Sequence, residues 1–255
     1  MAVTGQKVAL VTGAAGGIGR AVARRLAADG LRLALIDQDE AGLAELVAAL
    51  EAEGMGSGSL CAAAADVSSE ADVATYVAEA RGLGPIGVLC NVAAILGRLD
   101  WLQEVTVEEF DRIMAVNSRG TWLNMKHACA AMIEAGDGGS VINSSANLVN
   151  GALAKFAPYI ASQHAVVGLT TTGAVELAQH GIRVNAVMIG PSEAPMSEAA
   201  ISQLFDDTSE TPPAPLPLAR RGKPEEIAEV FGFLAGDRSS FVTGARLPAD
   251  GGHSA

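Results

Sequence analysis

A glycine-rich turn near the start of the sequence has the residues and spacing needed to bind a phosphate group. It joins the apolar run 8–12 to a helical pattern and reads Gly13-Ala14-Ala15-Gly16-Gly17-Ile18-Gly19. The first N–H groups of a helix have no acceptor within the helix and can therefore bind an anion. We expect Gly13 to permit the sharp bend, Gly17 to leave room for a pyrophosphate, and Gly19 to let the helix pack closely on its strand.

A carboxylate follows this turn at the distance typical of a dinucleotide site. Asp37 comes directly after the apolar run 31–36, about 20 residues beyond the glycines, where it would accept hydrogen bonds from an adenosine ribose. An ordinary tight turn can contain the same glycines. The strand before the turn, the helix after it and the acidic residue together favour dinucleotide binding over that alternative.

Apolar runs of strand length alternate with helical patterns along most of the chain. The expected strands are residues 7–12, 31–36, 60–65, 86–91, 139–144, 182–189 and 245–248. The expected helices are residues 17–29, 39–53, 69–82, 106–135, 158–180 and 224–235. This order predicts an α/β fold with a doubly wound parallel sheet that helices cover on both faces.

Residues 190–222 interrupt this alternation. The segment contains the acidic pair Asp206-Asp207 and the prolines Pro191, Pro195, Pro212, Pro213, Pro215 and Pro217. A loop of this length in a compact domain is usually a lid over a binding site or a partly disordered segment. We expect a substrate lid, with partial disorder as the alternative.

The composition limits the classes of partner. A length of 255 residues fits one α/β domain that spans residues 1–255. The formal net charge of −12 opposes binding to nucleic acid or to an anionic membrane surface, because both are negatively charged. The mean hydropathy of +0.29 indicates apolar surface that an oligomer interface would cover. We therefore expect a homo-oligomer that binds a small molecule.

The cysteines and the first residues indicate a cellular location. Cys61, Cys90 and Cys129 lie far apart and lack the spacing of metal ligands, so we expect no metal site. Residues 1–6 lack the basic start and apolar stretch of a secretory signal, and no apolar run reaches membrane-spanning length. These features favour a reduced, cytoplasmic setting.

Several short motifs resemble those of the short-chain dehydrogenase/reductase family, in the family's order and spacing. They are Thr12-Gly13-x-x-x-Gly17-Ile18-Gly19, Asp66-Val67, Asn91, Asn117, Ser144-Ser145, Tyr159 and Arg183-Val184-Asn185-Ala186-Val187. The resemblance covers essentially the whole chain. It implies a Rossmann fold with about seven strands, usually assembled as a tetramer through the helices near 106–135 and 158–180.

The motifs that bind the cofactor in this family are intact. The resemblance implies an adenine pocket at Asp66-Val67 and an Asp37 carboxylate that pairs with the ribose 2′-hydroxyl and repels a 2′-phosphate. NAD is therefore the implied cofactor. The same resemblance implies further cofactor contacts at Ile18, Asn91, Ala93 and Gly190.

Tyr159 and Ser145 are the catalytic residues that the resemblance implies. A phenol can exchange a proton with a substrate oxygen while hydride moves to or from carbon, and a serine hydroxyl can orient that oxygen. Ser145 lies fourteen residues before Tyr159, one more than the commonest family spacing, so Ser144 is the alternative. In the family, the residue at Asn117 holds a water that leads to the active-site lysine.

The catalytic motifs also depart from the family pattern. The family has a lysine four residues after the tyrosine, whereas this chain has Gln163. Val92 and Ala94 stand where the family usually has asparagine and glycine, and Ala194 replaces a threonine that commonly contacts the nicotinamide carboxamide. These changes are all expected near the nicotinamide.

Two other residues need to be placed because each could supply a charge or a proton. Lys155, four residues before Tyr159, is either a substitute cation or a solvated loop residue. His164 directly follows Gln163 and should point about 100° away from it around the helix, which favours a surface or interface position.

Two classes of function fit these residues. The first is an NAD(H)-dependent oxidoreductase that interconverts a hydrophobic secondary alcohol and a ketone, biased toward reduction because the lysine charge is missing. The second is a non-redox isomerase or lyase of the same fold, or a cofactor-binding regulatory or partner subunit. The hydrophobic substrate is suggested by the apolar residues Leu148, Val149, Leu153, Phe156 and Met188.

Overall fold

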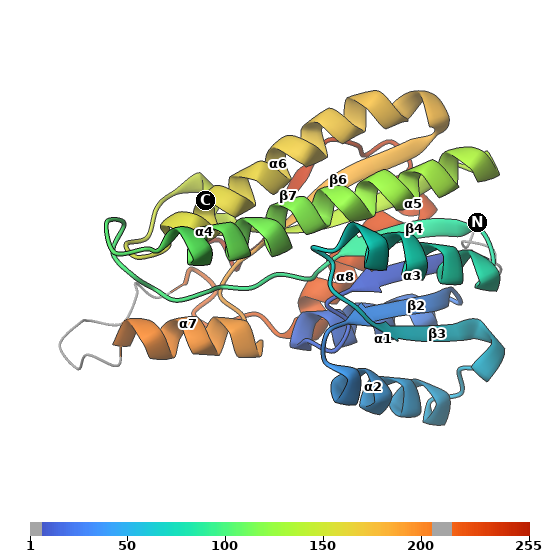
Figure 1. Ribbon diagram of the computed structural model, residues 1–255, viewed down its shortest axis with the longest axis horizontal. Helices are drawn as coiled ribbons and strands as arrows, with labels where there is room; N and C mark the ends of the chain where they lie inside the picture. Colours follow the sequence, from blue (N-terminus) through green and yellow to red (C-terminus); the bar gives the residue numbers. More distant parts are fainter. Residues whose placement is uncertain (1–6, 206–215) are drawn as a thin grey trace.

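The computed structural model describes residues 7–205 and 216–255 and has a seven-stranded parallel sheet at its centre (Figure 1). The strand order is β3-β2-β1-β4-β5-β6-β7, and every neighbouring pair is parallel. The strands are β1 (Val8–Thr12), β2 (Arg32–Asp37), β3 (Leu60–Ala64), β4 (Ile86–Asn91), β5 (Gly139–Ala146), β6 (Ile182–Ile189) and β7 (Arg246–Ala249). The expected doubly wound α/β fold in a single domain is confirmed.

Helices cover both faces of the sheet. They are α1 (Gly17–Ala28), α2 (Glu40–Ala52), α3 (Glu70–Leu83), α4 (Val107–Met114), α5 (Thr121–Ala135), α6 (Ala157–Leu177), α7 (Pro195–Phe205) and α8 (Pro224–Ala235). The buried side chains of α1, α2 and α8 form one apolar cluster with the sheet, and those of α3, α5 and α6 form a second cluster on the other face. The inner strands β1, β2, β4, β5 and β6 are therefore apolar on both sides, which explains their apolar runs in the sequence.

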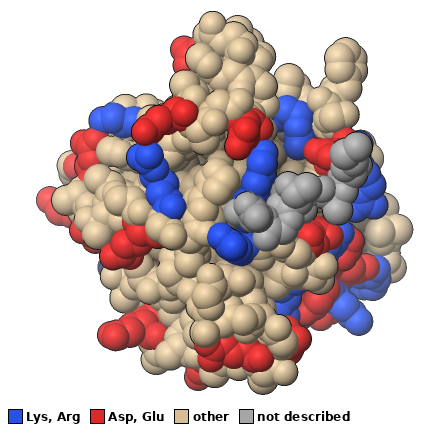
Figure 2. Space-filling view, turned by 90° about the vertical axis from the view of Figure 1, so that its right-hand side faces the viewer, with Lys and Arg blue, Asp and Glu red and all other residues tan. Residues whose placement is uncertain are grey.

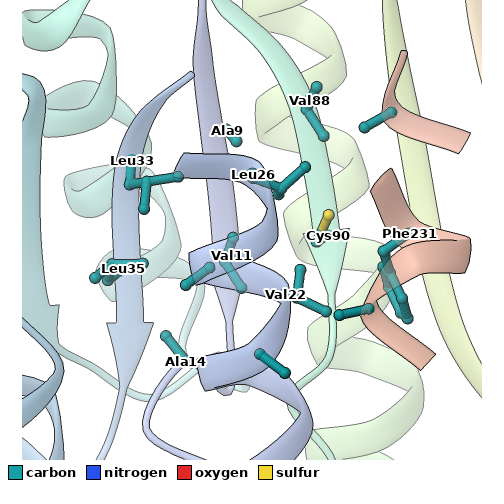
Figure 3. Packing of buried hydrophobic residues seen from close by; sticks show 14 of the residues in the cluster. Ala9, Val11, Ala14, Val22, Leu26, Leu33, Leu35, Val88, Cys90 and Phe231 are labelled. Carbon is teal, nitrogen blue, oxygen red and sulfur yellow. The ribbon is translucent and has the colours of Figure 1, made fainter. Parts of the chain in front are cut away.

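The first apolar cluster packs β1 and α1 against β2 and α8. Figure 3 shows Val11 of β1 and Val22 and Leu26 of α1 between Leu33 of β2 on one side and Phe231 of α8 on the other. All five side chains are fully buried. Burying an aliphatic or aromatic side chain of this size contributes about 1.5–3 kcal/mol. The two elements that the glycine turn joins, β1 and α1, are thus tightly packed.

The strand order creates a crevice at the carboxyl end of β1. The chain runs outward through β2 and β3 on one side of β1 and through β4 to β7 on the other. Thr12 and Asn91, the last residues of β1 and β4, are paired in register. In doubly wound sheets, ligands bind at the point where the strand order reverses in this way.

The helical run expected at residues 106–135 is interrupted by a π-helical turn. Ala115–Gly120 forms this turn between α4 and α5. Its wider backbone places Asn117 in the interior, where Nδ2 donates to the Ile95 carbonyl (2.9 Å) and to Ser162 Oγ (3.0 Å). π-turns within α-helices are rare and occur mostly at functional sites. The sequence pattern, which is apolar on the same face before and after the turn, did not reveal it.

The segment expected as a loop at 190–222 contains a helix. α7 begins at Pro195, and proline is favoured at the first position of a helix because its missing N–H is not needed there. The many prolines of the segment masked this helix in the sequence. Asp206-Asp207, Pro212, Pro213 and Pro215 lie outside the described residues. In Figure 1, α7 (orange) lies at the left, on the opposite side of the molecule from the label N.

The surface carries charges of both signs and several exposed apolar side chains. Figure 2 shows the molecule from the right-hand side of Figure 1, and acidic and basic residues are interspersed on that face. Large apolar side chains are exposed on α4, α5 and α6, among them Val107, Phe110, Trp122, Ile133 and Val175. Within residues 7–205 and 216–255, no helix combines the length and apolarity needed to cross a membrane.

Candidate active site

A cavity of about 820 Å³ opens at the carboxyl edge of the sheet. Its walls come from the β1–α1 turn, the ends of β2, β5 and β6, the segment after β4, and parts of α6 and α7. The residues expected at the site that line it are Gly13, Gly17, Ile18, Gly19, Asp37, Val67, Ala93, Ser145, Tyr159, Gln163 and Gly190. The fold thus brings together residues that are far apart in the sequence.

The glycine turn is shaped by backbone contacts that exclude side chains. Gly13 has φ of +67°, and a Cβ there would lie 2.7 Å from the backbone nitrogen of Ala93. A Cβ on Gly19 would collide with the Gly13 carbonyl oxygen. Gly16, the N-cap of α1, has no side chain to cap the helix, so the first-turn N–H groups remain available at the cavity wall. This arrangement fits a pyrophosphate.

Asp37 connects the glycine turn to the end of β2. Its Oδ2 accepts a hydrogen bond from Ala15 N (2.9 Å), and its Oδ1 accepts one from Asp39 N (3.1 Å). Each carboxylate oxygen can accept a further hydrogen bond. Because Asp37 also lines the cavity, the carboxylate is available to the hydroxyl groups of a ribose.

Tyr159 of α6 and Ser145 of β5 both line the cavity. Tyr159 is half-buried in the cavity wall, and its ring packs edge-on against Phe156 with centroids 6.2 Å apart. Burial raises the pKa of the Tyr159 phenol to about 12. Ser145 Oγ donates to the Gln163 carbonyl at 3.2 Å, one helical turn after Tyr159. The two hydroxyl groups are therefore held on adjacent elements.

The alternation of β5 distinguishes Ser145 from Ser144. Side chains on a strand alternate between the two faces of the sheet, so Asn143 and Ser145 point the same way. Asn143 Nδ2 donates to Thr170 Oγ1 of α6 (2.9 Å), and Ser145 also contacts α6. Ser144 must then point to the other face, with Ile142 and the α1–α8 cluster. This geometry favours Ser145 as the partner of Tyr159.

Gln163 is the polar residue nearest to Tyr159 along the cavity side of α6. Its side chain is 3% exposed and lines the cavity, and within the described part of the chain its carboxamide makes no hydrogen bond. A carboxamide that makes no hydrogen bond to the protein can bond to water or to a ligand in the cavity. The Gln163 side chain is therefore available to a ligand.

The two residues considered as extra sources of charge or protons are engaged elsewhere. The Lys155 ammonium lies over the Trp101 ring, 5.3 Å from its centroid. His164 is exposed, and its Nδ1 donates to the Ile160 carbonyl (2.9 Å). Lys155 thus makes a cation–π contact rather than a contact with Tyr159, and His164 is not among the residues that line the cavity.

Comparisons with known proteins agree with this geometry. A family model described as enoyl-(acyl carrier protein) reductase matches residues 13–254. A short-chain dehydrogenase/reductase from Armillaria gallica is 39% identical over 258 residues, which cover 96% of this chain and 95% of that protein. The chain belongs to the short-chain dehydrogenase/reductase family. It is thus an oxidoreductase of that family.

Solved structures of other proteins give the same assignment. The crystal structure of levodione reductase matches with a TM-score of 0.92, 36% identity and 98% of both chains covered. A 3-ketoacyl-(acyl-carrier-protein) reductase from Brucella melitensis, complexed with NADH, matches with a TM-score of 0.88, 33% identity and 98% of both chains covered. Actinorhodin polyketide ketoreductase, a variant with NADPH, has a TM-score of 0.91 and 33% identity, covering 100% of this chain and 99% of that one.

Three of the residues expected at the site of this protein do not line the cavity. Asp66 turns away, and its Oδ1 accepts from Ser68 N at 2.8 Å. Asn91 is buried below the cavity, where its Nδ2 donates to Asn143 Oδ1 at 2.8 Å. Its Oδ1 is the one buried side-chain polar atom without a partner in the described part of the chain. Asn117 is 1% exposed and supports Ile95 and Ser162. Their roles in ligand binding remain predictions.

The positions that were expected to depart from the family pattern all belong to the cavity. Val92, Ala94, Gln163 and Ala194 all line it. Of the apolar residues expected in the wall, Leu148, Leu153 and Phe156 are present, whereas Val149 and Met188 are not. Met188 is buried in β6 instead, because its alternation turns it toward the core.

Several cavity residues were not anticipated from the sequence, and two of them come from the end of the chain after β7. His253 and Ser254, which follow β7, line the cavity beside Asn147. Because β7 is parallel to its neighbour β6, its carboxyl end lies at the same edge of the sheet, and so do the residues that follow it. The turn Asp250-Gly251-Gly252 after the last expected strand was therefore the available signal. No group of three or more His, Cys, Asp or Glu in residues 7–205 and 216–255 is arranged to hold a metal ion.

Proposed function

We propose that this protein is an NAD(H)-dependent oxidoreductase that interconverts a hydrophobic secondary alcohol and a ketone. The observation that carries the proposal is one continuous cavity with the glycine turn and Asp37 at one end and Tyr159 and Ser145 at the other. That arrangement combines a place for a dinucleotide with a proton donor for a carbonyl oxygen. The relatives named above act through related dehydrogenase or reductase activities, which agrees with this proposal.

The glycine turn and Asp37 would hold the cofactor. The first-turn N–H groups of α1 would bind the pyrophosphate, and the Asp37 carboxylate would accept hydrogen bonds from the adenosine ribose. A 2′-phosphate beside that carboxylate would be repelled, which favours NAD over NADP. When bound, the cofactor supplies or accepts the hydride.

Tyr159 would move the proton. During reduction, the neutral phenol donates its proton to the carbonyl oxygen, and the Ser145 hydroxyl holds that oxygen by a hydrogen bond. During oxidation, the phenolate must take the proton from the alcohol. The pKa of about 12 keeps Tyr159 in the phenol form at neutral pH, so oxidation lacks its base.

Gln163 would strengthen the kinetic bias toward reduction. An ammonium at about 5 Å in an effective dielectric of about 20 would stabilise the phenolate by about 3 kcal/mol, or about two pKa units. A carboxamide offers a hydrogen bond without that charge. Reduction is therefore favoured kinetically, while the overall equilibrium is unchanged.

Apolar side chains define the substrate end of the cavity. Three of them, Leu148, Leu153 and Phe156, are close to Tyr159 in the sequence, and the fourth, Met196, belongs to α7. These residues favour a hydrophobic carbonyl compound. Residues 190–222, which include α7, are proposed as the substrate lid.

The proposal is tested by following NADH oxidation with a panel of aliphatic and aromatic ketones at neutral pH. We expect turnover with at least one ketone, and Tyr159→Phe should lower kcat/KM by about a hundred- to ten-thousandfold. His164→Phe, an exposed change on the same helix, should leave kcat/KM within about twofold. Tight NADH binding without turnover of any ketone or alcohol would favour the non-redox alternative, which the four cavity substitutions support.

We further propose that the protein is a homo-oligomer, as a tetramer, in the cytoplasm. The exposed apolar side chains of α4, α5 and α6 support this assembly, because a monomer would leave them in water. The net charge of −12 supports a small-molecule partner over nucleic acid or an anionic membrane.

A further inference from the structure

The residues after β7 form a polar wall of the cavity that the reaction described above does not use. Asn147, just past the end of β5, is 5% exposed and lies within hydrogen-bond distance of two of these residues. Its Nδ2 is 2.7 Å from His253 Nδ1 and 3.4 Å from Asp250 Oδ2. Asn147, His253 and Ser254 all line the same cavity as Tyr159.

Asp250 determines which way the Asn147 amide points. Its carboxylate accepts hydrogen bonds from Gly252 N (3.0 Å), Ser254 N (3.0 Å) and Ser254 Oγ (2.6 Å). Although burial alone would raise the pKa of Asp250, these hydrogen bonds hold it below its usual value, so the group is ionised. A carboxylate can only accept, and the Asn147 atom that faces it must be the amino nitrogen.

This orientation fixes the tautomer of His253. The Asn147 amino nitrogen that donates to Asp250 also faces His253 Nδ1, which must therefore accept. In a neutral imidazole, the other nitrogen then carries the proton. His253 Nε2–H makes no hydrogen bond within the described part of the chain, and the ring is exposed at the cavity wall. The wall thus presents a hydrogen-bond donor to a ligand.

The charges around the cavity limit the group that this donor can bind. No lysine or arginine is among the described residues that line the cavity, whereas Asp37 and Asp39 are acidic and line it. A carboxylate or phosphate on this part of the ligand would have no lysine or arginine to pair with. An uncharged carbonyl oxygen needs only the donor.

We propose that His253 Nε2–H binds a second, uncharged carbonyl oxygen of the substrate, so that the preferred substrates are dicarbonyl compounds or keto esters. Asn147 and Asp250 act as positioning residues that hold the imidazole in the donating tautomer. This inference rests on the proposed function in placing the reacting carbonyl at Tyr159 and Ser145.

The kinetic test uses ketones with the same number of carbons and a second carbonyl at different positions. The probes are 2-hexanone, hexane-2,3-dione, hexane-2,4-dione and hexane-2,5-dione, each with NADH. At least one dione should have a KM about tenfold below that of 2-hexanone, as expected for one hydrogen bond. In His253→Phe this advantage should vanish, while the KM for 2-hexanone stays within about twofold.

Matched variants separate the hydrogen bond from ring packing. His253→Gln keeps a donor and should retain part of the dione preference, whereas Asn147→Leu should weaken it while leaving kcat for 2-hexanone unchanged. His164→Phe is the control for loss of a histidine outside the cavity. Equal KM values for all four probes, or a dione preference that persists in His253→Phe, would overturn the inference.

A second experiment does not depend on turnover. In nitrogen-15 spectra of the histidines in the NAD⁺ complex, the His253 signal, assigned from His253→Phe, should show an accepting Nδ1 and a protonated Nε2. The reactive dione should shift its Nε2–H signal more than 2-hexanone does. If no ketone is turned over but this shift occurs, the proposed function fails and the binding inference stands. A protonated Nδ1, or no shift with any dione, contradicts the inference.

Discussion

The two ends of the cavity are constrained by different kinds of contact. At the glycine turn, Gly13 and Gly19 lie so close to neighbouring backbone that any side chain would collide with it. On α6, the Gln163 side chain lines the same cavity as Tyr159, and within the described residues its carboxamide makes no hydrogen bond that would fix it. The first end is fixed by the shape of the backbone, and the second by the chemistry of side chains.

This difference explains how the catalytic motifs can change while the cofactor motifs persist. A substitution at Gly19 would disrupt packing between β1 and α1, and the fold itself would suffer. Gln163 lies within α6 and lines the cavity, so we expect a change of its side chain to leave the β1–α1 turn intact. Chemistry can therefore shift in one end of the site while the fold and the cofactor end stay the same.

The largest expected effect follows from filling the glycine turn. Gly19→Ala should destabilise the protein by about 2–3 kcal/mol through overpacking and lower NADH affinity by more than about a hundredfold, because the first-turn N–H groups are displaced. Thermal unfolding and fluorescence titration measure the two effects. Gly82→Ala is the control: it lies in α3, and a Cβ there meets nothing within 4 Å. It should stay within about 1 kcal/mol of the unmodified protein.

The next effect concerns the charge at 163. Alcohol oxidation requires the phenolate of Tyr159, whose pKa is about 12, so the rate should rise about tenfold per pH unit between pH 8 and 10. Gln163→Lys should lower that pKa by about one to two units, so that oxidation at neutral pH rises by up to about a hundredfold. Gln163→Met, which removes the carboxamide without adding charge, should leave the position of the rise unchanged.

A separate variant checks whether the Lys155 ammonium acts on Tyr159. Lys155→Met should leave the pH profile of oxidation in place, because the Lys155 ammonium lies over the Trp101 ring. The opposite result would be an oxidation rate that no longer rises above pH 8 in the unmodified protein and becomes pH-dependent in Lys155→Met. It would mean that Lys155 supplies the positive charge to Tyr159.

The smallest expected effect concerns the choice of cofactor. NADH should bind at least about tenfold more tightly than NADPH, which corresponds to about 1.4 kcal/mol. Asp37→Ala should reduce this preference, mainly by strengthening NADPH binding. Asp39→Ser removes a nearby charge while retaining a residue that can cap α2, and it should change the preference less. Equal affinities in the unmodified protein, measured by fluorescence titration, would refute the role of Asp37.

Residues whose constraints are local were predicted well from the sequence. The β1–α1 turn and the position of Asp37 depend on a strand, a bend and a helix that are adjacent in the chain, and the structure places both at the cavity. The π-turn at Asn117 and the helix α7 were missed. At the π-turn, the side-chain amide of Asn117 donates hydrogen bonds to Ile95 and Ser162, which are distant in sequence, and these contacts hold the backbone in its wider form. At α7, the sequence alone does not distinguish a proline at the start of a helix from a proline in a loop.

The sequence by itself determined the parallel α/β sheet and the glycine turn between its first strand and helix. Those features follow from periodicity and backbone sterics within short segments. Only the tertiary structure decided that Ser145 rather than Ser144 faces α6, and that His253 meets Asn147 across 106 positions of sequence. Strand order and register set these contacts, and both are fixed by the packing of the whole sheet, which no local pattern contains.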